Sequence, residues 1–130
     1  DGKGTATAGT GAFALPVTFP SRIDATGDSA TTPEEILAAS HAVCFGMVLT
    51  NTIGKKGGLA RRVRVTATVT ADLSDAGIKV ASSHLAATVE GLEGIDASTL
   101  SELAEGAEKE CPISNAIRGN VAITVEARAA

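Results

Sequence analysis

The longest regular pattern in the sequence runs from Thr32 to Ile53 and predicts a long helix with Cys44 at its middle. Thr31 or Thr32 can cap the first turn, and Pro33 suits the first helical position. Apolar residues then recur at helical spacing on two adjoining stripes, made of Ile36, Val43 and Met47 and of Leu37, Cys44 and Val48. Small residues between them would let another backbone approach closely, so we expect a buried helix.

Length and composition point to one domain, residues 1–130, with a core of small aliphatic side chains. Only three aromatic residues occur, and the formal charge of −4 argues against a general nucleic-acid partner. No apolar run approaches the roughly 20 residues that span a bilayer, so we expect no membrane partner. Two distant cysteines match no secreted disulfide scaffold, which favours a reducing cytoplasm. Residues 1–4 look like the interior of a strand-turn region, so we expect the chain to be trimmed at its N-terminus.

The other segments read as short regular elements around the long helix. Strict alternation of apolar and polar residues over 63–73 predicts a strand buried on one side, with Arg62 and Arg64 facing solvent. The remaining elements are a hairpin at 5–19 with Pro16 on an edge strand, a loop at 20–30 carrying Arg22, a turn at 74–77, a strand at 78–89 bulged between Val80 and Leu85, and a last strand at 121–127.

A second helix follows the bulged strand. Asp96 or Ser98 can cap it, and Pro112 disfavours helical geometry at Cys111, so the helix should end there and a short one should begin at Pro112. Its apolar face comprises Leu100, Leu103, Ala104, Ala107 and Cys111. The order hairpin, helix, hairpin, helix, strand predicts an α+β domain with helices on one face of a mainly antiparallel sheet.

The two cysteines raise the question of chemistry. A lone mid-helix cysteine usually behaves as a small hydrophobe, but Cys111 also lies on an inner helix face, so the thiols could meet when the helices pack. A reactive Cys44 would need a nearby cation to favour its thiolate, because an ordinary thiol is mostly protonated at neutral pH. His41, one turn earlier, and Arg22 are the candidates, and the permanent charge of Arg22 favours it, although Arg22 also fits a solvated loop residue.

Glu34 stands ten positions before Cys44, which is roughly 15 Å along a helix axis. It cannot serve that cysteine directly, so a catalytic Glu34 should belong to the site of a second subunit. The alternative is a glutamate that only favours the helix start. His41, Cys44, His84 and Cys111 could also be metal ligands, but their spacing lacks the tight local pairs of zinc sites, and we expect no metal or cofactor.

The segment TTPEEILAASHAVCF, followed by CPISNAI with its cysteine sixty-seven positions after Cys44, resembles the OsmC/Ohr family (osmotically inducible protein C and organic hydroperoxide resistance). The Ser-His before Ala42 is more similar to the OsmC branch. The resemblance implies an intertwined homodimer with two central helices per chain and active sites at the subunit interface.

The resemblance also implies an activity: a peroxidase that reduces organic hydroperoxides with electrons from a dithiol reductant, for example of the lipoyl type. Residue by residue, Cys44 matches the family's peroxidatic cysteine, Cys111 the resolving cysteine, Glu34 the glutamate after the proline, and Arg22 the arginine in FPSR. A non-catalytic dimeric domain that binds a lipid-like ligand is the alternative, and thiols beyond disulfide reach would favour it.

Overall fold

The computed structural model describes residues 2–23 and 29–130, which form two compact units that divide between Leu37 and Ala38. The first unit opens with an antiparallel hairpin of β1 (Lys3–Thr7) and β2 (Ala14–Thr18), as predicted. The second unit contains the sheet and both cysteines. The expectation of one domain over 1–130 stays a prediction.

The segment after the hairpin corrects one prediction. Residues Phe19–Ile23 form a short helix, α1, where we expected a strand end and then a loop. The Ser21 N–H donates to Thr18 Oγ1 at 3.2 Å, and the Ser21 hydroxyl donates to the Thr18 carbonyl at 2.8 Å. These two bonds cap the turn that carries Arg22. The rest of the predicted loop, apart from residues 29 and 30, lies outside the described residues.

The long helix, α2, spans Pro33–Lys55 and begins where the sequence predicted. The Glu35 N–H donates to Thr32 Oγ1 at 3.1 Å, so Thr32 is the cap. At the other end Gly57 has a φ of +78°, while the N–H groups of Gly57 and Gly58 donate to the carbonyls of Gly54 and Ile53. This glycine stop ends the helix at Lys55, beyond the predicted end at Ile53.

The buried side of α2 differs from the expected one. The helix buries Ala38, His41, Phe45, Leu49 and Ile53. Val43 and Met47, which belonged to the stripe predicted to be buried, are 57% and 69% exposed. Because α2 is apolar on nearly every side, spacing alone could not identify the face that packs. The same composition makes α2 long and apolar enough to cross a membrane, contrary to our expectation, although core helices also have these properties.

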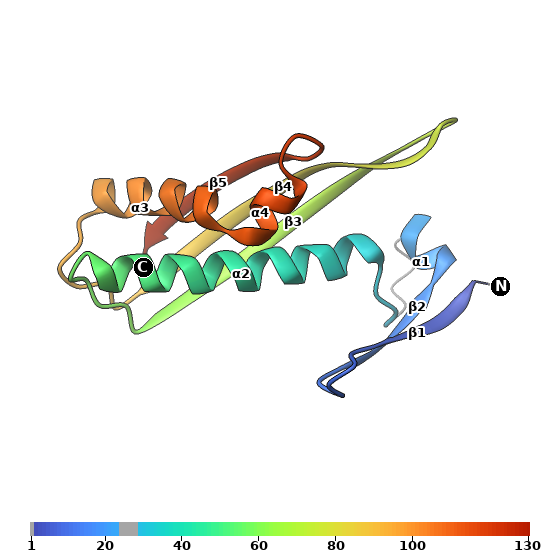
Figure 1. Ribbon diagram of the computed structural model, residues 1–130, viewed down its shortest axis with the longest axis horizontal. Helices are drawn as coiled ribbons and strands as arrows, with labels where there is room; N and C mark the ends of the chain where they lie inside the picture. Colours follow the sequence, from blue (N-terminus) through green and yellow to red (C-terminus); the bar gives the residue numbers. More distant parts are fainter. Residues whose placement is uncertain (1, 24–28) are drawn as a thin grey trace. The chain divides into compact units, whose positions relative to one another are not determined.

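The second unit is built on a three-stranded sheet of order β3-β4-β5, formed by β3 (Arg62–Ser74), β4 (Gly77–Glu90) and β5 (Ala122–Ala129). β3 and β4 form the predicted antiparallel hairpin, and a register shift after Thr70 leaves Ala81 as the extra residue of the predicted bulge. β5 pairs with β4 in parallel, because the chain crosses back through two helices first (Figure 1).

Those crossover helices are α3 (Ala97–Glu110) and α4 (Pro112–Ile117), with Cys111 between them. Asp96 caps α3 by accepting the Thr99 N–H at 2.7 Å, as predicted. Figure 1 shows α2, α3 and α4 on the same side of the sheet. The core between the layers contains Phe45, Leu49, Leu85, Val89, Leu100 and Cys111. The α+β prediction with helices on one face is therefore confirmed.

Candidate active site

The two cysteines lie together in the second unit, as the sequence predicted. Cys44 is half-buried on α2, and Cys111 is completely buried at the junction of α3 and α4. Both are free thiols, and the Cys111 thiol lies close enough to raise the pKa of Cys44. Two cysteines that are sixty-seven positions apart in the sequence therefore lie together as one thiol pair.

The turn between α3 and α4 places Cys111 at this point. Its backbone is extended, with φ of −67° and ψ of 118°, because the following Pro112 excludes helical geometry. Pro112 then opens α4, whose second residue, Ile113, has no helical acceptor for its N–H. That N–H donates to the Cys44 sulfur instead. The α3–α4 turn therefore supplies both the second thiol and a hydrogen-bond donor to the first.

Burial is the largest influence on the Cys44 thiol and raises its pKa. The Ile113 N–H lowers the pKa, the neighbouring Cys111 raises it, and the net pKa lies above the ordinary value. In the part of the chain that the structure describes, none of the groups acting on this thiol is a cation. A reactive Cys44 thus needs a positive charge that these groups do not supply.

His41 does not supply that charge. It is fully buried, with Nδ1 2.7 Å from Ser83 Oγ and Nε2 2.7 Å from Ser114 Oγ. Burial lowers its pKa, with a weaker opposite effect from Glu108, so the imidazole is neutral at pH 7. The two hydroxyls also occupy both ring nitrogens, which leaves neither free for a metal. His84 is a surface residue that hydrogen-bonds to Thr124.

Arg22 and Glu34 form an ion pair in the first unit. The Arg22 Nη2 and Nε atoms lie 2.6 Å and 2.9 Å from Glu34 Oε1. Burial raises the pKa of Glu34, but the hydrogen bond and charge of Arg22, with a backbone N–H, outweigh it and lower the pKa overall. We expected Arg22 to stabilise the Cys44 thiolate and a catalytic Glu34 to belong to the site of a second subunit. The ion pair places the Arg22 guanidinium against the Glu34 carboxylate, an arrangement that the sequence did not predict.

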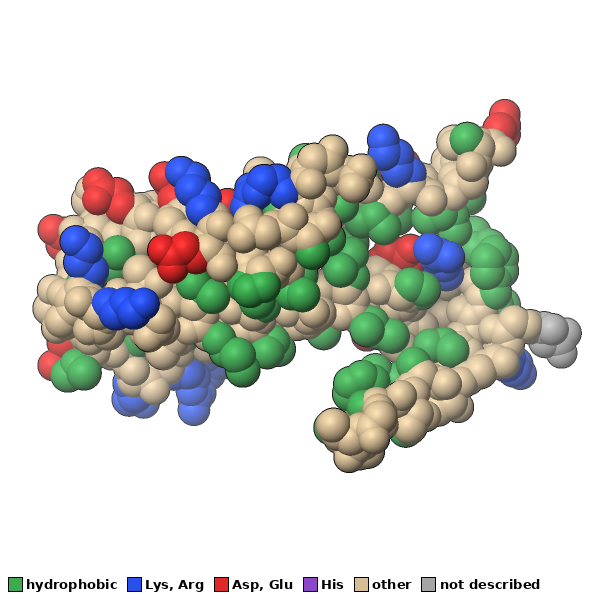
Figure 2. Space-filling model, in the orientation of Figure 1, with side chains coloured by type: hydrophobic (Ala, Val, Ile, Leu, Met, Phe, Trp, Pro, Cys, Tyr) green, Lys and Arg blue, Asp and Glu red, His purple; other side chains and the backbone are tan. Residues whose placement is uncertain are grey.

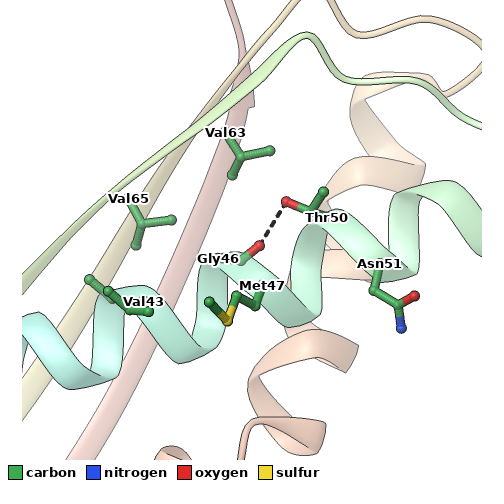
Figure 3. A pocket seen from close by; sticks show the side chains of 8 residues that line it. Val43, Gly46, Met47, Thr50, Asn51, Val63 and Val65 are labelled. Carbon is green, nitrogen blue, oxygen red and sulfur yellow. Dashed lines mark hydrogen bonds between the residues drawn. The ribbon is translucent and has the colours of Figure 1, made fainter. Parts of the chain in front are cut away.

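An apolar groove of about 620 Å³ lies between α2 and β3. Figure 3 shows Val43 and Met47 on α2 with Val63 and Val65 on the facing strand, and Thr50 donating a hydrogen bond to the Gly46 carbonyl. In the space-filling view, hydrophobic side chains reach the surface along α2 (Figure 2). Val43 adjoins Cys44 in sequence, but Cys44 is not among the residues that line the groove.

Sequence reasoning missed three buried polar residues near the cysteines. Ser83 and Ser114 are fully buried partners of His41, and Glu108 is 8% exposed and lies 2.7 Å from Arg118 Nη2. One signal was present: Ser83 occupies an inward position of β4, on the face of Leu85, where a hydroxyl needs a partner. No local pattern identified the other two.

Comparison with known families matches residues 26–126 to the model of the OsmC-like proteins. The matched region contains Glu34, Cys44 and Cys111, and Arg22 precedes it. The chain is 33% identical over 123 residues to peroxiredoxin OsmC of Escherichia coli, covering 94% of this chain and 84% of the relative. It is 35% identical over 105 residues to organic hydroperoxide resistance protein OhrA of Bacillus subtilis, covering 76% and 68%.

Solved structures agree with these relatives. An organic hydroperoxide resistance protein from Elizabethkingia anophelis superimposes with a TM-score of 0.83 at 25% identity, covering 99% of this chain and 90% of that one. The OhrB protein of Bacillus subtilis gives a TM-score of 0.74 at 26% identity, covering 98% and 92%. Sequence and fold therefore point to the same group of proteins.

Proposed function

The chain belongs to the OsmC-like family, and from that premise we propose that it is a cysteine-based peroxidase that reduces organic hydroperoxides to alcohols in defence against oxidative stress. Relatives named peroxiredoxin OsmC and organic hydroperoxide resistance protein support a peroxide-related role. The observation that carries the proposal is the thiol pair itself. A partly exposed Cys44 lies beside a buried Cys111, as attack followed by disulfide closure requires.

In the proposed cycle, the Cys44 thiolate attacks the outer oxygen of the hydroperoxide and breaks the O–O bond. The alkoxide takes up a proton and leaves as the alcohol, while Cys44 becomes a sulfenic acid. The Cys111 thiol then attacks the Cys44 sulfur, and a disulfide and one water are formed. A dithiol reductant restores both thiols by exchange and is itself oxidised to a disulfide.

We assign the positive charge that favours the Cys44 thiolate to Arg22 of a second subunit, where Arg22 is held in its ion pair with Glu34. Among the described residues, the groups that act on Cys44 include no cation, and Arg22 already pairs with Glu34. Glu34 and Cys44 are ten positions apart in the sequence of α2, too far for one chain to bring them together on a straight helix. A homodimer lets the pair from one subunit meet the cysteines of the other, with Glu34 fixing the guanidinium and Arg22 favouring the thiolate.

The groove between α2 and β3 supports the same homodimer. Val43 and Met47 leave apolar surface exposed on a helix whose other side is core, and Ala42 and Gly46 are small enough for close helix packing. We assign this face to a second copy of the chain. An apolar surrounding of the paired site would also favour an organic hydroperoxide over hydrogen peroxide. The proposed cycle needs no metal or cofactor, and cytoplasmic reductants are consistent with free thiols.

The test is hydroperoxide consumption with an alkyl or aryl hydroperoxide and with hydrogen peroxide, using a lipoyl-type dithiol or a monothiol as reductant. We expect turnover with the organic substrate and the dithiol. Cys44→Ser should abolish turnover, whereas Cys111→Ser should react once and then stall or over-oxidise. Full turnover by Cys44→Ser would refute the proposal. In that case the groove leaves a second candidate, a non-catalytic dimer that binds a lipid-like ligand, which a fluorescent fatty-acid probe would detect.

A further inference from the structure

His41 forms a buried link between α2, β4 and α4 that the proposed reaction cycle does not use. Its two ring nitrogens each contact one serine hydroxyl at 2.7 Å, Ser83 on β4 and Ser114 on α4. All three side chains are fully buried. A buried polar group that loses its partner costs more than the bond itself contributes, so this arrangement is strongly held.

The link lies next to the thiol contacts on both helices that it joins. His41 precedes Cys44 by three positions on α2, which places the two residues one above the other on adjacent turns. Ser114 directly follows Ile113, whose N–H donates to the Cys44 sulfur. The bond from His41 to Ser114 and the contact from Cys44 to Ile113 are therefore neighbouring links between the same two helices.

The short turn from Cys111 to Ser114 needs such a link. α4 is only six residues long, and its first residue, Pro112, has no N–H with which to bond to its surroundings. The Ser114 hydroxyl is a side-chain anchor from α4 to α2. Ser83 holds the opposite edge of the imidazole, so the ring cannot rotate away from Ser114 without losing a second bond.

We propose that His41 is a positioning residue: its bond to Ser114 holds the Cys111–Ser114 turn against α2, so that the Ile113 N–H and the Cys111 thiol both stay at the Cys44 sulfur. The consequence for disulfide closure rests on the proposed function. The consequence for Cys44 acidity does not, because it concerns the resting thiol. The two consequences are therefore measured separately.

The test compares Ser114→Ala with Ser83→Ala as a matched pair. Each removes one buried hydroxyl from the same imidazole, so both should lower the melting temperature to a similar extent. Only Ser114→Ala frees the turn. In a Cys111→Ser background, the pH dependence of Cys44 alkylation by iodoacetamide should show a higher thiol pKa for Ser114→Ala and no change for Ser83→Ala. Ser114→Thr, which retains a hydroxyl, should restore the original profile.

With Cys111 present, diamide oxidation measures closure of the Cys44–Cys111 disulfide without any peroxide. We expect Ser114→Ala to slow closure about tenfold, the scale expected for loss of one buried hydrogen bond, and Ser83→Ala to slow it less than twofold. If either alanine variant does not fold, His41→Gln, which can keep the Ser114 bond, and His41→Asn, which can keep only the Ser83 bond, replace them. Equal effects within the pair would overturn the inference. A protein without peroxidase activity that still shows the predicted difference would refute the proposed function alone.

Discussion

Met47→Asp tests the proposed subunit interface. Met47 is 69% exposed on α2, so within a single chain a carboxylate there meets solvent and should change the unfolding free energy by no more than about 0.5 kcal/mol. In the proposed dimer the same carboxylate would be buried in an apolar groove without a partner, which would weaken dimerisation by about 3 kcal/mol. A two-fold interface contains the substitution twice, for a total of about 6 kcal/mol or roughly a 10⁴-fold higher dimer Kd.

The measurement is sedimentation equilibrium across a wide range of protein concentration, with peroxidase activity followed over the same range. Wild type should be dimeric, and Met47→Asp should be monomeric and inactive but normally folded by circular dichroism. Leu59→Asp is the control, because Leu59 is 67% exposed and lies outside the groove. An unchanged dimer Kd for Met47→Asp, or a monomeric wild type with full activity, would show that this face is not the interface.

Three further predictions concern the core, the buried histidine and the ion pair. Leu49→Ala, at a fully buried position, should lower the unfolding free energy in urea by about 3 kcal/mol, whereas Leu73→Ala at the surface should change it by under about 1 kcal/mol; equal losses would contradict the core described above. Burial lowers the pKa of His41, so the unfolded chain binds a proton at this residue more readily than the folded chain does. The contribution of neutral His41 to the free energy of unfolding is therefore complete above pH 6.5 and declines as the pH falls toward the folded pKa. His41→Gln should flatten that part of the pH–stability curve, and an unchanged slope would show that another group titrates. Glu34→Gln should lower kcat/KM about tenfold or more, because it weakens the bond that holds the Arg22 guanidinium in place. The neighbouring substitution Glu35→Gln should change kcat/KM little. Equal losses of kcat/KM in the two variants would show that Glu34 does not position Arg22.

Local signals predicted most of the secondary structure because each one acts over a few residues. Pro33 and Thr32 set the start of α2, and Pro112 sets the break at Cys111. The short helix α1 was missed because two hydrogen bonds from Ser21 to Thr18 decide it. A segment of Ser, Pro and Arg is compatible with a loop until those bonds form.

The candidate site was predicted in part. Two cysteines on inner helix faces correctly implied that the thiols meet, since both helices had to pack on one core. The ion pair between Arg22 and Glu34 was not anticipated, because the two residues are twelve positions apart across a helix start and no periodic pattern relates them. The assigned roles of the four residues remain predictions.

The sequence by itself determined a long helix over 32–53, a bulged hairpin of strands at 63–73 and 78–89, and a helix that ends at Cys111, since caps, alternation and proline geometry are local. Only the tertiary structure decided which side of α2 is buried, because nearly every side of that helix is apolar and the choice depends on the sheet and helices that pack on it. It also decided the surroundings of His41, whose partners lie 42 and 73 positions away. Hydrogen bonds over such separations follow from the packing of whole elements, and they fix the turn that brings Cys111 to Cys44.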